Sequence, residues 1–341
     1  MPEIIAESID RLCTIEIRPQ AGHTQRGVIR PLYEAARELS GSLPLTYHAA
    51  KALTDSTKQN NYVFMITGSG FSPRLPKGEV DGMLGTALLA RAINLGLGAK
   101  PVLVVENRYA GPLIAATQAA GLPVLDRAAI DNRQVGAIHE RYPESEEDIQ
   151  LAIQTLLNKY EPTAVVAIER PSTNTKGFGH SVNGAPHAAR PLAGYLINEA
   201  HTQGILTIGV GDGGNEIGMG RIQEAVQRVL PYGKTCRCPC GAGIAAAIAT
   251  DVLVVANVSN WGAYGIAACL ALLCHDNSIF PDDGSFCEVF KDCVRAGALD
   301  GISTRQALSD DGIPIEAHRG VLSILRAMIT IGTLNLPQHV K

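Results

Sequence analysis

The chain has 341 residues, of which 46% are hydrophobic, 18% charged and 5% aromatic. This composition is that of a folded globular protein and excludes a disordered chain. The formal net charge of −4 and the lack of any run of Lys and Arg argue against nucleic acid as a partner.

No part of the sequence predicts contact with a membrane. Residues 1–18 carry four acidic side chains and no apolar core, so we expect no signal peptide. The most apolar stretch, residues 241–274, is interrupted by Asp251, Asn257 and Asn260, and its pieces fall short of the roughly 20 residues that span a bilayer. We therefore expect a cytoplasmic protein whose eight cysteines are reduced thiols.

The first 60 residues differ from the rest in pattern. They predict helices at Arg30–Ser40 and Ala49–Thr54 and no strand. We therefore expect an N-terminal helical extension over residues 1–60 and an α/β domain over residues 61–341. Turn-rich pieces over residues 276–320 predict a second small decoration beside the sheet.

Five short runs rich in Val and Ile predict buried strands. They are continuous rather than alternating, which is typical of strands covered on both faces of a parallel sheet. The runs are Tyr62–Thr67, Pro101–Val105, Ala164–Ile168, Leu206–Val210 and Val252–Ala256.

Helical patterns lie between these runs, and the alternation predicts an α/β fold with a parallel sheet and helices on both faces. The predicted helices are Leu84–Leu95, Gly111–Ala120, Arg190–His201, Ile217–Leu230 and Gly262–Leu273. Residues 172–189, rich in Gly, Asn, Thr and His, predict a long loop of the kind that often covers a site.

Acidic or amide side chains follow all five strands. Ligands of open parallel sheets bind outside the carboxyl ends of the strands, so we expect these side chains to converge there. Crowded carboxylates raise one another's pKa, and a divalent cation with a preference for oxygen, Mn²⁺, Mg²⁺ or Ca²⁺, relieves that cost. The predicted ligands are Glu79, Asp81, Glu169, Asp212 and Glu216.

Simpler interpretations exist for several of these residues. Asp81 can cap the following helix, Glu79 can be a solvated loop residue, and Glu169 with Arg170 can form a plain ion pair. A dinucleotide site is disfavoured, because Asp212 would place a carboxylate beside a pyrophosphate.

Cys236, Cys238 and Cys240 form a C-x-C-x-C cluster that suits a soft metal. The sequence shows no neighbouring C-x-x-C or His pair that would complete a four-ligand zinc site. We therefore interpret the three thiols as bystanders near a loop and a helix start.

Several motifs resemble the D-glutamate cyclase family, C-terminal domain. The longest are GVGDGGNEIGMG at residues 209–220 and VSNWGAYGIA at residues 258–267, and shorter ones include EVDGMLG at residues 79–85 and AIER at residues 167–170. The similarity spans roughly residues 62–335. It implies a Rossmann-like fold, an acidic metal-binding cavity, and a lyase that converts D-glutamate to 5-oxo-D-proline and water or catalyses the reverse.

These observations together predict the following roles. Glu169 or Glu216, whichever is not bound to metal, acts as the general base, and Arg170 clamps the α-carboxylate of a small acidic substrate. The predicted substrate-binding residues are Asn215, Asn260 and Ser69.

Two alternative functions stay open: a non-catalytic protein that binds metal or phosphate, and a hydro-lyase for another small acid. The oligomeric state is also open, and a homo-oligomer is compatible with the sequence.

Overall fold

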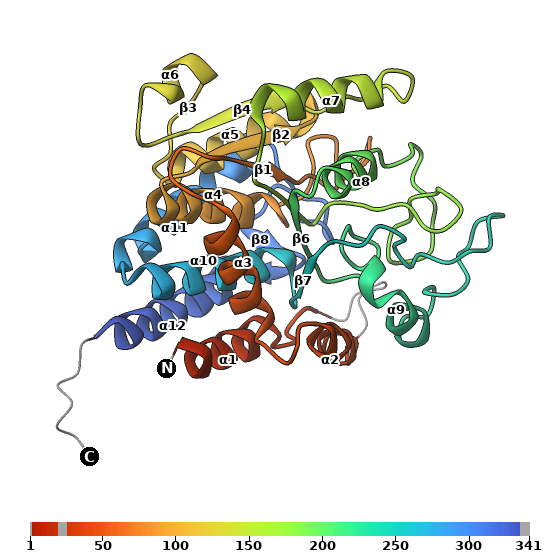
Figure 1. Cartoon of the computed structure of the whole chain (residues 1–341). Coiled ribbons are helices and arrows are strands. Elements are labelled where there is room, and N and C mark those ends of the chain that lie inside the picture. Colours follow the sequence, from red (N-terminus) through yellow and green to blue (C-terminus); the bar gives the residue numbers. More distant parts are fainter. Residues whose placement is uncertain (1, 20–25, 335–341) are drawn as a thin grey trace.

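A computed structural model describes residues 2–19 and 26–334. Within these residues the centre is a seven-stranded parallel sheet with the order β3-β4-β2-β1-β5-β6-β7 (Figure 1). The strands are β1 (Tyr62–Ile66), β2 (Lys100–Val105), β3 (Val124–Leu125), β4 (Ala137–Arg141), β5 (Ala164–Ile168), β6 (Leu206–Gly211) and β7 (Val252–Val255).

The five predicted strands are confirmed, with bounds that differ by no more than one residue at either end. Two further strands were missed. β3 has only two residues, and β4 continues from Ala137 and Ile138 into His139, Glu140 and Arg141. Because β4 lies next to the edge strand, its last residues are not fully buried and it lacks a continuous apolar run.

Helices cover both faces of the sheet, as the sequence predicts. Val63 and Met65 of β1 point into the larger core, whereas Phe64 and Ile66 point into the smaller core on the opposite face. The larger core is closed by α3 (Leu45–Ser56), α4 (Met83–Leu97), α5 (Asn107–Ala119), α10 (Ser259–Cys274), α11 (Asp283–Arg295) and α12 (Ile315–Thr333), and the smaller by α6 (Arg127–Asp131), α7 (Ile149–Tyr160) and α8 (Gly194–Thr202).

Two predicted helices begin later than expected: α8 begins at Gly194 rather than Arg190, and the helix predicted from Ile217 begins at Gln223. Residues 217–219 do not start the helix; a short 3-10 turn, η1 (Gly220–Ile222), precedes α9 (Gln223–Val229). The backbone N–H of Gly218 instead donates to Ile248 O at 2.9 Å, and Gly218 has a φ of +101°. A left-handed residue cannot lie inside an α-helix, so the helix starts only after this turn.

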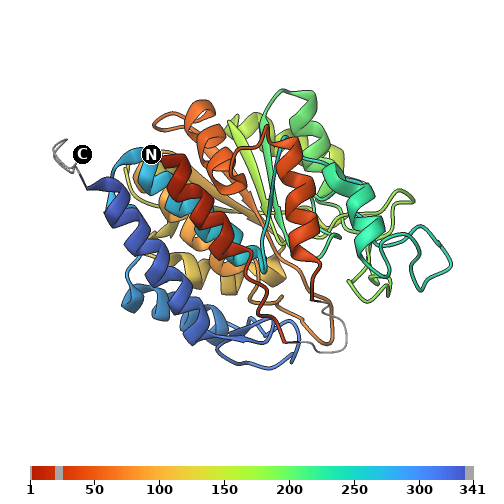
Figure 2. The ribbon, with the colours of Figure 1, turned by 90° about the horizontal axis from the view of Figure 1, so that it is seen from below.

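The N-terminal helices belong to the same packed core as the sheet. α1 (Pro2–Cys13) lies beside α12 and over α10, and α2 (Ile29–Leu39) reaches β7 (Figure 2). Ala6, Ile9 and Leu32 are fully buried. α10 is buried from Ser259 to Leu272, because the sheet lies on one side of it and the N- and C-terminal helices lie on the other.

The region 276–320, which was predicted as a small decoration, contributes α11 to the larger core. It contains η2 (Asn277–Ile279), α11 and a short antiparallel pair, β8 (Ser309–Asp310) with β9 (Ile313–Pro314). The turn between β8 and β9 carries Asp311 at a φ of +48°. This turn brings Asp311 to the sheet edge described below.

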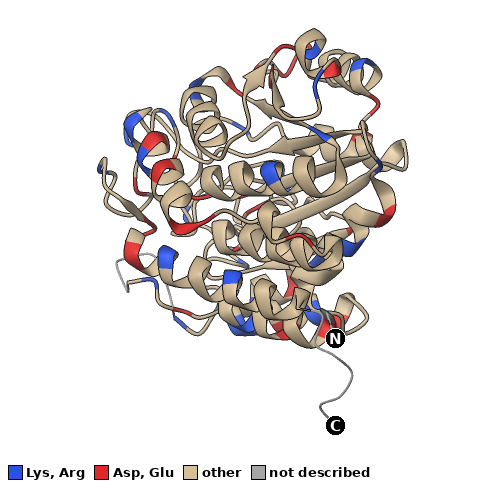
Figure 3. Ribbon diagram, turned by 90° about the vertical axis from the view of Figure 1, so that its left-hand side faces the viewer, with Lys and Arg blue, Asp and Glu red and all other residues tan. Residues whose placement is uncertain are grey.

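In the part of the chain that the structure describes, no helix is long and apolar enough to cross a membrane. On the face drawn in Figure 3, Lys and Arg are interspersed with Asp and Glu. No basic stripe crosses that face among the residues drawn in colour, in line with the low net charge.

A single buried carboxylate joins the three N-terminal helices. Asp10 is 1% exposed and accepts hydrogen bonds from Leu45 N at 2.6 Å and Thr46 N at 3.1 Å, the unpaired amides at the start of α3. Its Oδ2 also accepts from the Tyr33 hydroxyl of α2 at 2.8 Å. Asp10 therefore caps α3 from another helix.

We expect Asp10→Ala to lower the free energy of unfolding by about 3 kcal/mol, because it leaves several buried donors unpaired. The control is Asp55→Ala, which removes an exposed carboxylate paired with Lys51 and should change stability by no more than about 0.5 kcal/mol. Urea denaturation of both variants measures the difference. Equal changes in the two variants would contradict the capping role.

Candidate functional site

An acidic pocket lies at the carboxyl ends of β1, β5 and β6. The chain reverses direction across the sheet between β1 and β5, which is where ligands of such folds bind. The cavity measures about 170 Å³. Its charged lining residues come from five separate segments: Arg18, Arg74, Glu79, Glu169, Asp212, Glu216 and Asp311.

The structure brings together the residues that the sequence predicts as metal ligands. Oxygens of Glu169, Asp212 and Glu216 all lie within 4.8 Å of one another, and so do oxygens of Asp81, Asp212 and Asp311. Glu79 lines the same pocket. The convergence follows from the parallel sheet, because every strand delivers its next residues to the same edge.

Glu169 directly follows β5 in a left-handed conformation, with a φ of +49°. Such a conformation is uncommon for a residue other than glycine and occurs often at functional sites. Glu169 Oε2 accepts a hydrogen bond from Ser259 Oγ at 2.6 Å. The neighbouring Gly82 leaves room for this turn, because a side chain on Gly82 would lie 2.7 Å from Glu169 Cβ.

Glu216 reaches back toward the strand that precedes it. Its Oε1 accepts a hydrogen bond from Gly213 N at 2.8 Å. Its Oε2 is buried and has no hydrogen-bond partner among the described residues. A buried, unpartnered carboxylate oxygen is costly, so this atom is suited to accept a ligand.

Asp81 caps a helix, but a different one from the helix expected. Its carboxylate accepts from Ser259 N at 2.9 Å and Asn260 N at 2.7 Å, the first amides of α10. It does not cap α4, the helix that follows it in sequence. The aspartate at the positive end of a buried helix is stabilised there, and one of its oxygens still faces Asp212 and Asp311.

Arg18 pairs with two carboxylates of the pocket, and the sequence did not predict this role. Its Nη1 lies 3.2 Å from Asp212 Oδ2 and 3.2 Å from Asp311 Oδ2. It comes from the segment after α1, far from the strand motifs, and no local pattern marks it. Asp311, which lies in the turn-rich region 276–320, was also missing from the predicted site residues.

Burial and mutual repulsion raise the pKa of the pocket carboxylates. Burial, followed by the charge of Asp311, raises the pKa of Glu79 to about 8. Burial, followed by the charge of Asp212, raises the pKa of Glu216 to about 8. The pKa of Asp212 is also raised by burial, although Arg18 opposes the shift. Carboxylates of this kind are poised near neutral pH and favour any cation that enters.

The two groups of carboxylates differ in their own counter-ions. Arg18 already bridges Asp212 and Asp311, so the group that contains Asp81 has a positive charge beside it. The group of Glu169, Asp212 and Glu216 includes the unpartnered Glu216 Oε2. Arg18 pairs with only one member of this group, Asp212, and its oxygen donors are of the kind that suits a hard divalent cation.

Two predicted substrate residues lie outside the pocket lining. The Arg170 guanidinium donates to Glu106 Oε1 at 2.6 Å and to Thr67 O and Gly68 O, and it lines a neighbouring cavity instead. Asn260 is fully buried and donates to Asp310 Oδ2 at 2.8 Å, while its Oδ1 accepts from Gly85 N. Both side chains therefore have structural partners.

The other two predicted substrate residues, Ser69 and Asn215, do line the acidic pocket. Asn215 Nδ2 donates to His180 O at 2.8 Å. Its Oδ1 is buried without a hydrogen-bond partner in the described residues. Asn215 therefore anchors the loop over the pocket with one end and leaves an acceptor at the other.

The chain belongs to the D-glutamate cyclase-like family. The family described as D-glutamate cyclase-like, C-terminal, matches residues 30–326, which confirms the resemblance seen in the motifs. One relative is D-glutamate cyclase, mitochondrial, from Homo sapiens, which is 35% identical over 111 residues. The aligned part makes up 32% of this chain and 17% of the human protein, so the chain matches a small part of that relative.

The raised pKa values determine whether the free energy of unfolding of the metal-free protein rises or falls with pH. Glu79 and Glu216 hold a proton in the folded state up to about pH 8 but release it near pH 4.5 when unfolded. The folded state binds more protons in this window, so we expect the free energy of unfolding to fall as pH rises from about 5 to 8.

Glu216→Gln should flatten this decline, because glutamine keeps the acceptor for Gly213 N but does not titrate. The matched control, Glu288→Gln, alters an exposed residue of α11 and should leave the slope unchanged. Urea denaturation in the presence of chelator, at several pH values, measures all three slopes. A wild-type stability that rises over this range would contradict the buried-carboxylate account.

Proposed function

We propose that this protein is a metal-dependent lyase that closes D-glutamate to 5-oxo-D-proline with loss of water, and that it catalyses the reverse reaction as well. The proposal rests on one observation above all: a family member of this kind places Glu169, Asp212 and Glu216 beside Arg18 in one small pocket. That combination offers a cation site and an anion site within the reach of a single amino-dicarboxylic acid.

The metal is held by Glu169, Asp212 and Glu216 in this proposal. A hard divalent cation, Mn²⁺, Mg²⁺ or Ca²⁺, would supply Lewis-acid polarisation of the substrate γ-carboxyl and offset the negative charge that develops on its oxygen.

The residues of the chain bind and orient the substrate. Arg18, held by Asp212 and Asp311, lines the pocket and receives the α-carboxylate in place of the predicted Arg170, which lines the neighbouring cavity. Ser69 and the free Oδ1 of Asn215 lie on the pocket wall and hold the remaining polar groups. The cavity of about 170 Å³ is smaller than the roughly 300–1,000 Å³ of pockets for drug-sized ligands, so it suits a small acid.

A carboxylate outside the metal group handles the proton. The α-ammonium must lose one proton before its nitrogen can attack the γ-carboxyl carbon. Glu79 lines the pocket, lies outside the group of Glu169, Asp212 and Glu216, and has a pKa of about 8, close to neutral pH. In the proposed steps Glu79 transfers the two protons that the nitrogen loses, one before the attack and one from the tetrahedral intermediate, to the γ-oxygen that leaves as water. The carbon–nitrogen bond forms in the attack, and the carbon–oxygen bond breaks when water leaves.

The direct test is turnover. Purified protein is incubated with D-glutamate in chelator and in millimolar Mn²⁺, and 5-oxoproline is followed by chiral liquid chromatography and mass spectrometry. We expect product with Mn²⁺ and little or none with chelator, and the L-enantiomer serves as the stereochemical control. Binding of D-glutamate and metal without product would favour a non-catalytic binding protein and would contradict the lyase.

Asp212→Asn tests the metal ligands. The change removes one formal charge at nearly constant volume, so we expect metal affinity to fall at least about tenfold, or about 1.4 kcal/mol, and turnover to fall with it. Folding should be largely retained, since the packing volume is unchanged. The matched control is Asp55→Asn on the surface of α3. A variant that binds Mn²⁺ as tightly as wild type would contradict the assignment, and calorimetric titration measures it.

A further inference from the structure

Two long loops that carry no helix or strand lie side by side next to the acidic pocket. One connects β5 to α8, and the other connects α9 to β7; they fill the right-hand side of Figure 1. Hydrogen bonds join them, including Arg237 N to Gly184 O at 2.9 Å and Asn174 Nδ2 to Gly243 O at 2.8 Å. Long irregular segments inside a compact domain need cross-links to hold one conformation.

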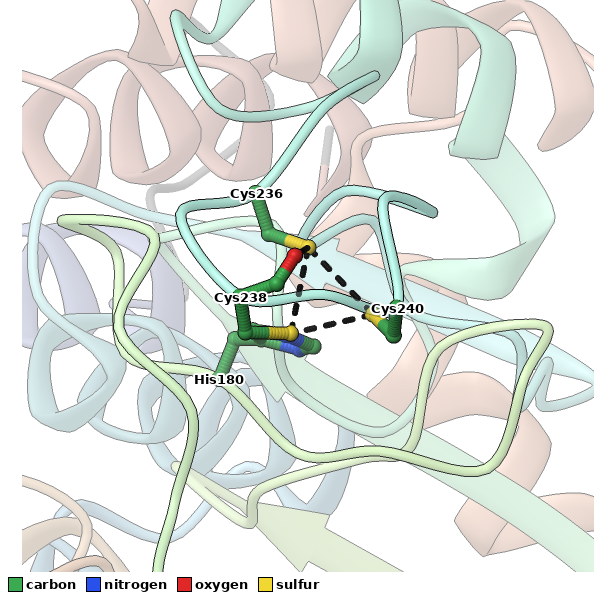
Figure 4. A group of neighbouring side chains, drawn as sticks. All are labelled: His180, Cys236, Cys238 and Cys240. Carbon is green, nitrogen blue, oxygen red and sulfur yellow. Dashed lines mark hydrogen bonds between the residues drawn. The ribbon is translucent and has the colours of Figure 1, made fainter.

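Three thiols and one imidazole meet where these loops touch (Figure 4). Cys236 Sγ lies 3.5 Å from Cys238 Sγ and 3.3 Å from Cys240 Sγ. His180 Nε2, from the first loop, lies 3.2 Å from Cys238 Sγ and 3.7 Å from Cys240 Sγ. All four donor atoms therefore lie within one small sphere, and the side chains point toward a common centre.

These separations fit a tetrahedral metal. Zinc–sulfur bonds of about 2.3 Å and zinc–nitrogen bonds of about 2.0 Å give edges of about 3.8 Å between sulfurs and about 3.5 Å between sulfur and nitrogen. The observed distances are 3.2–3.7 Å, so small side-chain adjustments would complete the shell. All three thiols are free rather than joined in disulfides.

We propose that His180, Cys236, Cys238 and Cys240 form a structural site for Zn²⁺. Four protein ligands close the coordination shell, which is typical of structural rather than catalytic zinc. The sequence analysis treated the cysteines as bystanders because it found no fourth ligand. His180 supplies that ligand from 58 residues before Cys238, a distance that the loop contact bridges only in the folded protein.

The zinc site positions the wall of the acidic pocket. Ser181, Val182 and Asn183 follow His180 directly and line that pocket. Asn215, next to Glu216, donates to His180 O. A metal that binds His180 to the second loop would therefore also restrict the movement of residues 181–183 and Asn215, which line the pocket near Glu216.

The two metal sites differ in chemistry and are separable by experiment. The His180 site offers thiolates and an imidazole, which select Zn²⁺, whereas the carboxylate group offers oxygen only and suits harder cations. The zinc proposal does not depend on the proposed lyase activity, because its readout is bound metal.

Full-length protein purified under reducing conditions, without chelator or added metal, is analysed by inductively coupled plasma mass spectrometry. We expect about one zinc per chain, as for a closed four-ligand site. Cys238→Ser and His180→Ala should lose most of this zinc and should still bind Mn²⁺ at the carboxylate group. The matched control is Cys287→Ser, which replaces another half-buried free cysteine on α11 and should keep its zinc.

A second measurement uses only wild-type protein and is therefore independent of whether the variants fold. Wild-type protein is stripped of metal, reduced and titrated with Co²⁺, which should produce the visible absorption bands of a tetrahedral cobalt–thiolate centre; one equivalent of Zn²⁺ should abolish them. Amide exchange over residues 174–189 should be slower with zinc than without it. Reduced wild-type protein that contains no zinc and binds neither ion, or a disulfide between two of the three cysteines in the purified protein, would overturn the proposal.

Discussion

The burial of several carboxylates at one edge of a parallel sheet is the constraint on which the rest of the structure depends. Each strand delivers polar residues to that edge, and a low-dielectric surrounding makes their charges repel. The fold offsets part of this cost in two ways. Arg18 pairs with Asp212 and Asp311, and the first amides of α10 pair with Asp81. Glu216 Oε2 and Asp310 Oδ1 are buried and still lack a hydrogen-bond partner in the described residues.

This compensation explains why the N-terminal helices are packed so closely on the sheet. α10, whose first amides pair with Asp81, is buried from Ser259 to Leu272, and α1 and α3 pack on it. Asp10 fixes α3 to α1, and the segment that leaves α1 carries Arg18 into the pocket. Residues 1–60 were predicted as an extension, and that domain boundary stays a prediction. Their helices nevertheless share one core with the sheet, and the segment after α1 contributes Arg18 to the site.

The sequence was informative wherever local pattern and topology agree. Continuous apolar runs identified five strands, and a parallel sheet necessarily brings the residues after them, including Glu169 and Asp212, to one edge. It was uninformative where a partner is chosen only by tertiary packing. Arg18 and His180 are each brought to their partners by the folded loops, and nothing in the neighbouring residues predicts those contacts. Arg170 shows the opposite failure: its position beside Glu169 suggested the site, but its side chain pairs with Glu106 in an adjoining cavity.

A pocket that selects one small acid needs a rigid lining, and part of the lining of this pocket belongs to the loop between β5 and α8. Hydrophobic packing cannot supply all of that rigidity, because Ser181 and Asn183 belong to a polar segment without helix or strand. Cross-links between the loops must supply the remaining rigidity, and Asn215 connects them to the site. Its Nδ2 fixes the backbone of His180, while its Oδ1 keeps an unused acceptor. A rigid cluster of His180 and the three cysteines therefore also restrains Asn215, the residue next to Glu216. The Asn215 side chain thus connects this cluster to the carboxylate group, and both help to shape the same pocket.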